Sequence, residues 1–175
     1  LTKDQLKAIY EINDDLRSDQ KMFRLLQGDV GSGKTIVALS TILNVINSKF
    51  QVAFMAPTEI LAQQHYNLAK SLLPDNVKID ILTSKTENKI RNKIISDLEN
   101  HQIDLLIGTH SLFQNKINYK KLGLIIIDEQ HKFGVKQRKK LSDKGGKNCD
   151  ILVMSATPIP RTMIMTVFGD MDVFI

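Results

Sequence analysis

Apolar positions follow a helical spacing at the start of the chain and form short continuous runs after it. Leu6, Ile9, Ile12 and Leu16 predict an amphipathic helix, and the residues at 22–26 predict the first strand. Further apolar runs predict strands at 52–55, 77–82, 103–107, 122–127, 151–154 and, cut short, 173–175. Helix-like stretches lie between strands near 36–46, 59–72, 86–99 and 136–142. This alternation predicts an α/β fold, a mostly parallel central sheet with helices on both faces.

Length and composition narrow the class of protein. At 175 residues, with 42% hydrophobic and 25% charged residues, the chain has the size and balance of one globular domain spanning residues 1–175. No apolar run approaches the roughly 20 residues of a membrane span, and the first residues lack a secretory signal. The single Cys149 cannot form an internal disulfide, and no Cys/His cluster indicates zinc. We expect a soluble, cytoplasmic protein without a membrane partner.

The net charge of +5 is concentrated in one segment. Residues 132–147 carry seven basic side chains against one acidic one, and residues 85–93 form a second, milder positive stretch. Two interpretations stay open for the longer segment. It is either a solvated face that keeps the protein soluble or a contact with a phosphate backbone, in which Arg138 would take part.

Residues 28–35 match the phosphate-loop pattern GxxxxGK[ST] in full, between a predicted strand and a predicted helix. The residues that we expect to surround the phosphates are Gly28, Gly31, Ser32, Gly33, Lys34 and Thr35. Glycines let successive backbone N–H groups point at a phosphate near the positive end of a helix. Lys34 then reaches the β and γ phosphates, and the Thr35 hydroxyl can hold Mg²⁺. The alternative is a chance match on a glycine turn.

The run from Leu122 to Ile127 contains no polar side chain, so we place it as a central strand with functional groups directly after it. Asp128 and Glu129 follow at that point. Asp128 is placed to bind Mg²⁺, Glu129 to act as the general base for an attacking water, and His131 to report the state of the γ-phosphate. The alternative is an ordinary acidic loop with a structural histidine.

Five motifs in order resemble the first motor lobe of superfamily-two helicases. Along the chain they are the phosphate loop at 28–35, the segments 56–62 and 108–110, the acidic motif at 128–131 and the segment 155–157. The resemblance implies that nucleic-acid contact or coupling involves Thr58, Glu59, Gly108, Thr109, His110, Ser155 and Thr157. It also makes Gln5 a candidate for contacting adenine. Hydroxyl groups at strand ends, Ser111 among them, can bind a sugar-phosphate backbone without selecting a base.

The wording of residues 28–35, 128–135, 156–162 and 169–173 resembles the RecG family of bacterial ATP-dependent DNA helicases. That family remodels stalled replication forks and branch-migrates Holliday junctions. The resemblance implies a RecA-like lobe one that uses ATP and Mg²⁺, within a larger monomeric bacterial protein that also holds a second RecA-like lobe and a wedge domain for branched or duplex DNA. Because the family's transition-state arginine lies in the second lobe, we expect the isolated lobe to be nearly inactive.

Three alternatives to this assignment stay open. The transcription-repair-coupling factor shares most of these motifs, but typically has a second Glu where Gln130 stands and often Phe where Ser32 stands. An RNA helicase would use the same general motifs. A non-motor nucleotide switch would use the phosphate loop alone, and its basic segment would dock a protein or a membrane.

Overall fold

The computed structural model of the protein describes residues 1–128, 144, 149–158 and 172–174. Its helices are α1 (Lys3–Arg17), α2 (Lys34–Asn47), α3 (Glu59–Leu72), α4 (Asn88–Glu99) and the short 3₁₀ helix η1 (His110–Phe113). Its strands are β1 (Phe23–Gln27), β2 (Gln51–Met55), β3 (Ile79–Leu82), β4 (Leu105–Gly108), β5 (Leu122–Asp128), β6 (Asp150–Ser155) and β7 (Asp172–Phe174).

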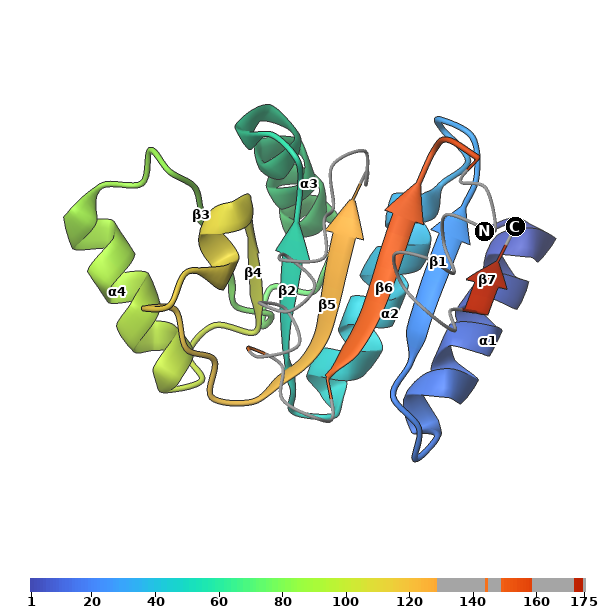
Figure 1. Ribbon diagram of the computed structural model, residues 1–175, viewed down its shortest axis with the longest axis horizontal. Helices are drawn as coiled ribbons and strands as arrows, with labels where there is room; N and C mark the ends of the chain where they lie inside the picture. Colours follow the sequence, from blue (N-terminus) through green and yellow to red (C-terminus); the bar gives the residue numbers. More distant parts are fainter. Residues whose placement is uncertain (129–143, 145–148, 159–171, 175) are drawn as a thin grey trace.

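The described strands form one seven-stranded sheet in the order β3-β4-β2-β5-β6-β1-β7, and every pairing in it is parallel (Figure 1). Strand β5 occupies the middle, which confirms the central position predicted from its apolar sequence. Parallel strands need crossover connections, and α2, α3 and α4 supply those from β1 to β2, from β2 to β3 and from β3 to β4. All carboxyl ends therefore lie along one edge of the sheet.

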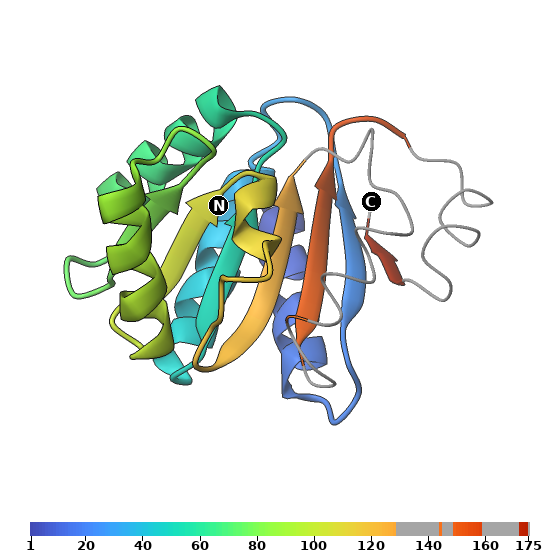
Figure 2. The same cartoon turned by 60° about the vertical axis from the view of Figure 1, so that its left-hand side comes forward.

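Two hydrophobic layers cover the sheet, one on each face (Figure 2). Buried residues of α1, α2 and α3 pack with Phe54 and Ile126 on one face. On the other face α4 and η1 pack with Ala53 and Ile125, the sequence neighbours of that pair. Side chains alternate between faces along a strand, so each central strand contributes to both cores. The predicted α/β fold with helices on both faces is confirmed.

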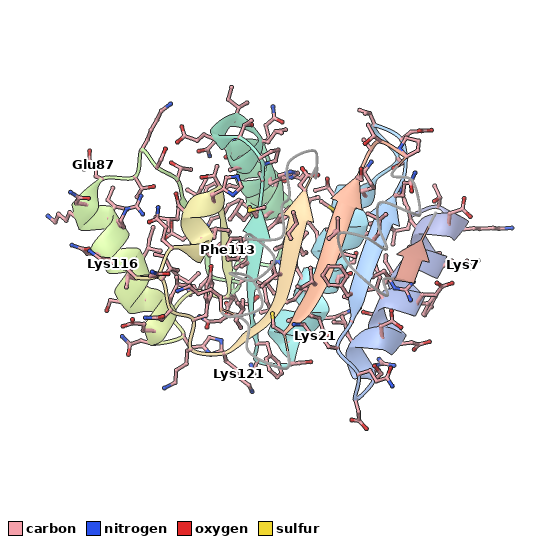
Figure 3. All side chains as sticks on the ribbon, in the orientation of Figure 1. Lys7, Lys21, Glu87, Phe113, Lys116 and Lys121 are labelled. Carbon is pink, nitrogen blue, oxygen red and sulfur yellow. The ribbon has the colours of Figure 1, made fainter. Side chains whose placement is uncertain are left out.

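The long helices agree with the prediction, and differences arise at the strand ends. The helix predicted at 59–72 is α3 itself, whereas the strand predicted from residue 77 begins at Ile79. The short helix η1 after β4 was not predicted, because four residues are too few to show a period. Phe113 of η1 lies over the sheet in Figure 3. In the same view Glu87 and Lys7 lie at opposite ends of the molecule. The helix predicted near 136–142 lies outside the described residues.

A buried arginine holds α1 beside β1. The Arg24 side chain donates from Nε to Asp15 at 2.6 Å and from NH1 to Glu11 at 3.2 Å. Arg24 is buried within the sheet, where an unpaired charge would be costly, so the two carboxylates of α1 compensate it. This contact fixes the direction of α1 and brings its first turn to the carboxyl edge of the sheet.

Candidate active site

The strand order decides which motifs become neighbours. Along the carboxyl edge, the loops follow in the order β4, β2, β5, β6 and β1. The segment at 155–157 after β6 therefore lies between the acidic residue at the end of β5 and the phosphate loop after β1. Strands β5 and β1 are two strand spacings apart, roughly 10 Å. A triphosphate bound at the phosphate loop can bridge a gap of this size.

The phosphate loop has a backbone that requires glycine at two positions. Gly31 and Gly33 both have φ of 82°, in the left-handed region. Gly33 is the N-cap of α2, so the loop wraps the positive end of that helix. A Cβ on Gly28 would lie 2.7 Å from the Ser32 hydroxyl, and one on Gly33 would overlap the Gln5 side chain. The two left-handed glycines and the close approaches at Gly28 and Gly33 agree with the glycine positions of the phosphate-loop pattern.

Lys34 lies at the first position of α2, and its ammonium is directed back into the loop. Its Nζ donates to the carbonyl oxygens of Gly28 at 2.6 Å and of Asp29 at 2.8 Å. The loop carbonyls thus hold the charge beside the positions where phosphate oxygens bind in a phosphate loop. Thr35 follows in the first turn of α2, half-buried. Its hydroxyl is of the type that holds Mg²⁺ there.

Gln5 connects α1 to the phosphate loop. Its side-chain oxygen accepts a hydrogen bond from the Thr2 amide at 2.9 Å, and the Thr2 hydroxyl accepts one from the Gln5 amide, forming a capping box. Its Nε2 donates to the Ser32 carbonyl at 3.0 Å. The structure therefore places Gln5 against the phosphate loop, and the adenine contact stays a prediction.

Ser155 connects β6 to the same loop. The Gly28 amide donates to the Ser155 carbonyl at 3.2 Å. The Ser155 hydroxyl, buried at the end of β6, donates to the Thr157 carbonyl at 3.0 Å and accepts from the Thr157 amide at 3.3 Å. The 155–157 turn is thus closed on itself and hydrogen-bonded to the first glycine of the phosphate loop.

Asp128 ends β5 with a partner that the sequence did not reveal. Its Oδ2 lies 2.6 Å from Nε2 of His65 on α3, and both side chains are about nine-tenths buried, 10% and 11% exposed. The available signal was the spacing of Ala62, His65 and Ala69, which places a polar residue on the apolar face of α3. Glu129 and His131, the other predicted catalytic residues, lie outside the described residues.

The residues predicted to contact nucleic acid lie in the loops after β2 and β4, next to Asp128. The Ala56 amide donates to the Gly108 carbonyl at 2.8 Å, which joins the two loops. Thr58 and His110 are exposed and Thr109 is half-buried, whereas Ser111 is only 4% exposed. The expectation that Ser111 faces a sugar-phosphate backbone is wrong for this structure, because η1 turns its side chain inward.

Thr58 and Glu59 already have structural partners. The Thr58 hydroxyl caps α3 by accepting from the Leu61 amide at 3.2 Å. Glu59 accepts from the Ser84 hydroxyl at 2.7 Å and pairs with Lys85 at 2.9 Å, and these contacts lower the pKa of its carboxyl. The first turn of α3 is therefore tied to the loop after β3.

Some basic side chains of the two positive stretches make contacts within the fold. Lys85 pairs with Glu59, and Arg91 donates to the Thr83 carbonyl at 2.7 Å. Of the segment 132–147 the structure describes Lys144, whose Nζ donates to the carbonyls of Asn115 at 3.1 Å and Ile117 at 2.7 Å. Burial lowers the Lys144 pKa. Arg138 lies outside the described residues.

Within the described part of the chain, no three His, Cys, Asp or Glu side chains gather into a metal-binding cluster. Thr35, in the first turn of α2, and Asp128, at the end of β5, each carry a side-chain oxygen of a type that can bind a hard cation. Such a sparse set suits Mg²⁺, which is bound by one or two protein groups together with waters and substrate phosphates. None of the helices that the structure describes is both long and apolar enough to span a bilayer.

Relatives of known function match the chain over its whole length. The ATP-dependent DNA helicase RecG of Streptococcus pneumoniae is 50% identical over 175 residues, which cover 100% of this chain and 26% of that protein. The ATP-dependent DNA helicase RecG of Thermotoga maritima is 53% identical over 174 residues, covering 99% of this chain and 22% of that protein. The chain thus spans about a quarter of the length of these curated relatives.

Solved structures of other proteins superpose on this chain over nearly its whole length. A structure of RecG bound to a three-way DNA junction superposes with a TM-score of 0.84 at 49% identity, covering 99% of this chain and 23% of that one. A DEAD box protein from Methanococcus jannaschii superposes with a TM-score of 0.73 at 25% identity, covering 98% of this chain and 48% of that one. The pattern of the DEAD/DEAH box helicase family matches residues 2–166. With its phosphate loop and acidic strand end on one edge of a RecA-like sheet, the chain belongs to the DEAD/DEAH box helicase family.

Proposed function

We propose that this chain is the ATP-binding lobe one of a RecG-type DNA translocase, which remodels stalled forks and branch-migrates Holliday junctions. The observation that carries the proposal is the identity of about 50% with RecG proteins across the whole chain. The superposition on RecG bound to a three-way junction supports it. In this proposal residues 1–175 belong to a larger bacterial cytoplasmic protein, which acts as a monomer with a second RecA-like lobe and a wedge domain.

The site performs phosphoryl transfer to water. Lys34 would release the loop carbonyls and pair with the β and γ phosphates of a bound nucleotide, while Thr35 of α2 and Asp128 at the end of β5 would hold the metal. Bound Mg²⁺ supplies neutralisation of the charge that develops on the phosphate oxygens. Glu129, next after Asp128, polarises the attacking water, and His131 responds to the γ-phosphate. The adenine is contacted by Gln5.

Coupling to DNA uses the same edge of the sheet. Thr58, Thr109 and His110 contact the DNA backbone, and the 155–157 turn carries the nucleotide state away from the phosphate loop. The bond between the Gly28 amide and the Ser155 carbonyl supports this route, because it connects the phosphate loop directly to the end of β6. Contacts to sugar and phosphate do not select a base, which suits a motor that steps along any sequence.

The test is nucleic-acid stimulation of ATP hydrolysis by the full-length protein. We expect forked DNA to stimulate most, plain duplex less, and single-stranded RNA at background level, because the wedge domain recognises branched DNA. Equal stimulation by plain duplex and fork would favour the transcription-coupling relative, and stimulation by RNA would favour an RNA helicase. A rate of hydrolysis that none of the three nucleic acids stimulates would favour the non-motor nucleotide switch.

The basic segment 132–147 makes a separate prediction. If Lys136, Arg138 and Lys139 bind phosphates, replacing all three with glutamine should reduce the steepness of the salt dependence of DNA binding by roughly 0.9 for each phosphate that is no longer neutralised. The measurement is the affinity of the full-length protein for forked DNA at salt concentrations from about 50 to 200 mM. An unchanged slope would assign the segment to a solvated face.

A further inference from the structure

The hydrogen bond between His65 and Asp128 joins two motifs that are far apart in sequence. His65 lies on α3, two helical turns or about 10 Å beyond its Thr58 cap, and Asp128 ends the central strand. The contact of 2.6 Å between Nε2 and Oδ2 is a short hydrogen bond to a carboxylate oxygen. With about 10% of each side chain exposed, water has little access to replace it.

The imidazole ring is itself fixed. It stacks on Phe54 with 4.6 Å between ring centroids and 30° between planes. Phe54 is fully buried on β2, and its register partner on β5 is Ile126, two residues before Asp128. The ring therefore has a defined orientation relative to β5, and Nε2 is directed at the carboxylate. A group held this firmly can orient its partner.

The contact uses one oxygen of the carboxylate. Oδ2 accepts the bond from His65, and among the described residues Oδ1 has no hydrogen-bond partner. A carboxylate held at one oxygen presents the other in a fixed direction, which is how outer groups orient metal ligands. A role limited to packing would not need a short polar bond at the end of the one strand that carries the acidic motif.

We propose that His65 is a positioning residue that holds the Asp128 carboxylate in the orientation in which it receives the magnesium of bound Mg–ATP. The inference rests on the proposed function, since it assumes that Asp128 takes part in binding Mg–ATP. Loss of an outer hydrogen bond to a metal ligand typically weakens metal binding 10- to 100-fold. The effect should fall on the magnesium requirement and leave metal-free nucleotide binding intact.

The experiment compares two side chains of matched length. His65→Gln keeps an N–H donor at about the position of Nε2, and His65→Met removes it, while both lose the stacked ring. Binding of a fluorescent non-hydrolysable ATP analogue to the full-length protein is measured as Mg²⁺ is added. A parallel series measures analogue binding in EDTA, without free Mg²⁺. Gln63→Leu, at an exposed position of α3, is the control, and circular dichroism melting checks the fold.

We expect the half-saturating Mg²⁺ concentration to rise roughly 10-fold or more for His65→Met and to stay near wild type for His65→Gln and Gln63→Leu. Binding in EDTA should be equal in all four proteins. Equal magnesium requirements for the Met and Gln variants would overturn the inference, as would a loss that appears equally in EDTA. If wild type shows no magnesium-dependent binding, the proposed function itself fails.

A second measurement does not depend on the variants folding. In wild type, the ¹⁵N resonances of the His65 ring should shift when Mg²⁺ is added with the analogue, and not when the analogue is added in EDTA. A ring signal that is insensitive to Mg²⁺, in protein whose analogue binding does depend on Mg²⁺, would reduce His65 to a structural contact between α3 and β5.

Discussion

Replacing Lys34 with alanine in the full-length protein is expected to lower ATP turnover on the order of 10³-fold, because one preorganised charge at the developing phosphate charge is removed. The fold should survive. The bonds that Lys34 makes to the Gly28 and Asp29 carbonyls lie in an exposed or half-buried loop, where water can replace the donor. The measurement is steady-state hydrolysis with saturating forked DNA, together with the melting temperature.

Lys120→Ala, which removes an exposed lysine elsewhere, is the matched control and should hydrolyse ATP like wild type. Lys34→Arg keeps the charge but not its compact shape, so it should recover only part of the activity. Turnover by Lys34→Ala within a few fold of wild type would show that this loop does not bind the transferred phosphate.

Gly108→Ala should lower the free energy of unfolding by about 3 kcal/mol, at the upper end of the usual cost of overpacking. Gly108 is buried at the end of β4 and pairs in register with Leu82 of β3. A Cβ there would overlap the Leu82 carbonyl oxygen and lie 2.9 Å from Cδ2 of Leu112. The first neighbour is backbone, so relief requires β3 and β4 to move apart.

Hydrogen exchange of the β3 and β4 amides in the full-length protein measures this effect locally. Thr109→Ala is the control, since it removes a predicted DNA contact without adding volume at the crowded position. We expect faster exchange for Gly108→Ala and wild-type exchange for Thr109→Ala. Unchanged exchange in Gly108→Ala would mean that the close approach of β3 and β4 is not needed for their pairing.

Much of the site was predictable because its chemistry is local. The phosphate-loop pattern is contained in eight consecutive residues, and the structure shows a left-handed backbone at two of its glycines and bonds from Lys34 to its carbonyls. Asp128 was predictable for a related reason, since a fully apolar run identifies a central strand and ligands bind beyond its end. The positions of α2 and α3 followed from their apolar spacing.

Other parts depend on pairs of residues that no sequence pattern connects. His65 and Asp128 are separated by 63 positions, and His65 by itself is one polar residue on an apolar helix face. Gly108 resembled a nucleic-acid contact in sequence, and that role stays a prediction; its close approach to the Leu82 carbonyl of β3 could not be predicted. Ser111 was expected to approach a sugar-phosphate backbone, whereas the structure buries it in the unpredicted helix η1.

The sequence by itself determined the alternation of strands and helices, the central strand and the phosphate loop, because each depends on contiguous residues and their period. Only the tertiary structure decided the strand order β3-β4-β2-β5-β6-β1-β7, the bond from Gly28 to Ser155 and the contact of His65 with Asp128. The physical reason is that an apolar run states that a strand is buried but not beside which strand it pairs. Neighbours along the carboxyl edge are set by packing across the whole sheet, and the proposed coupling of nucleotide to DNA depends on those neighbours.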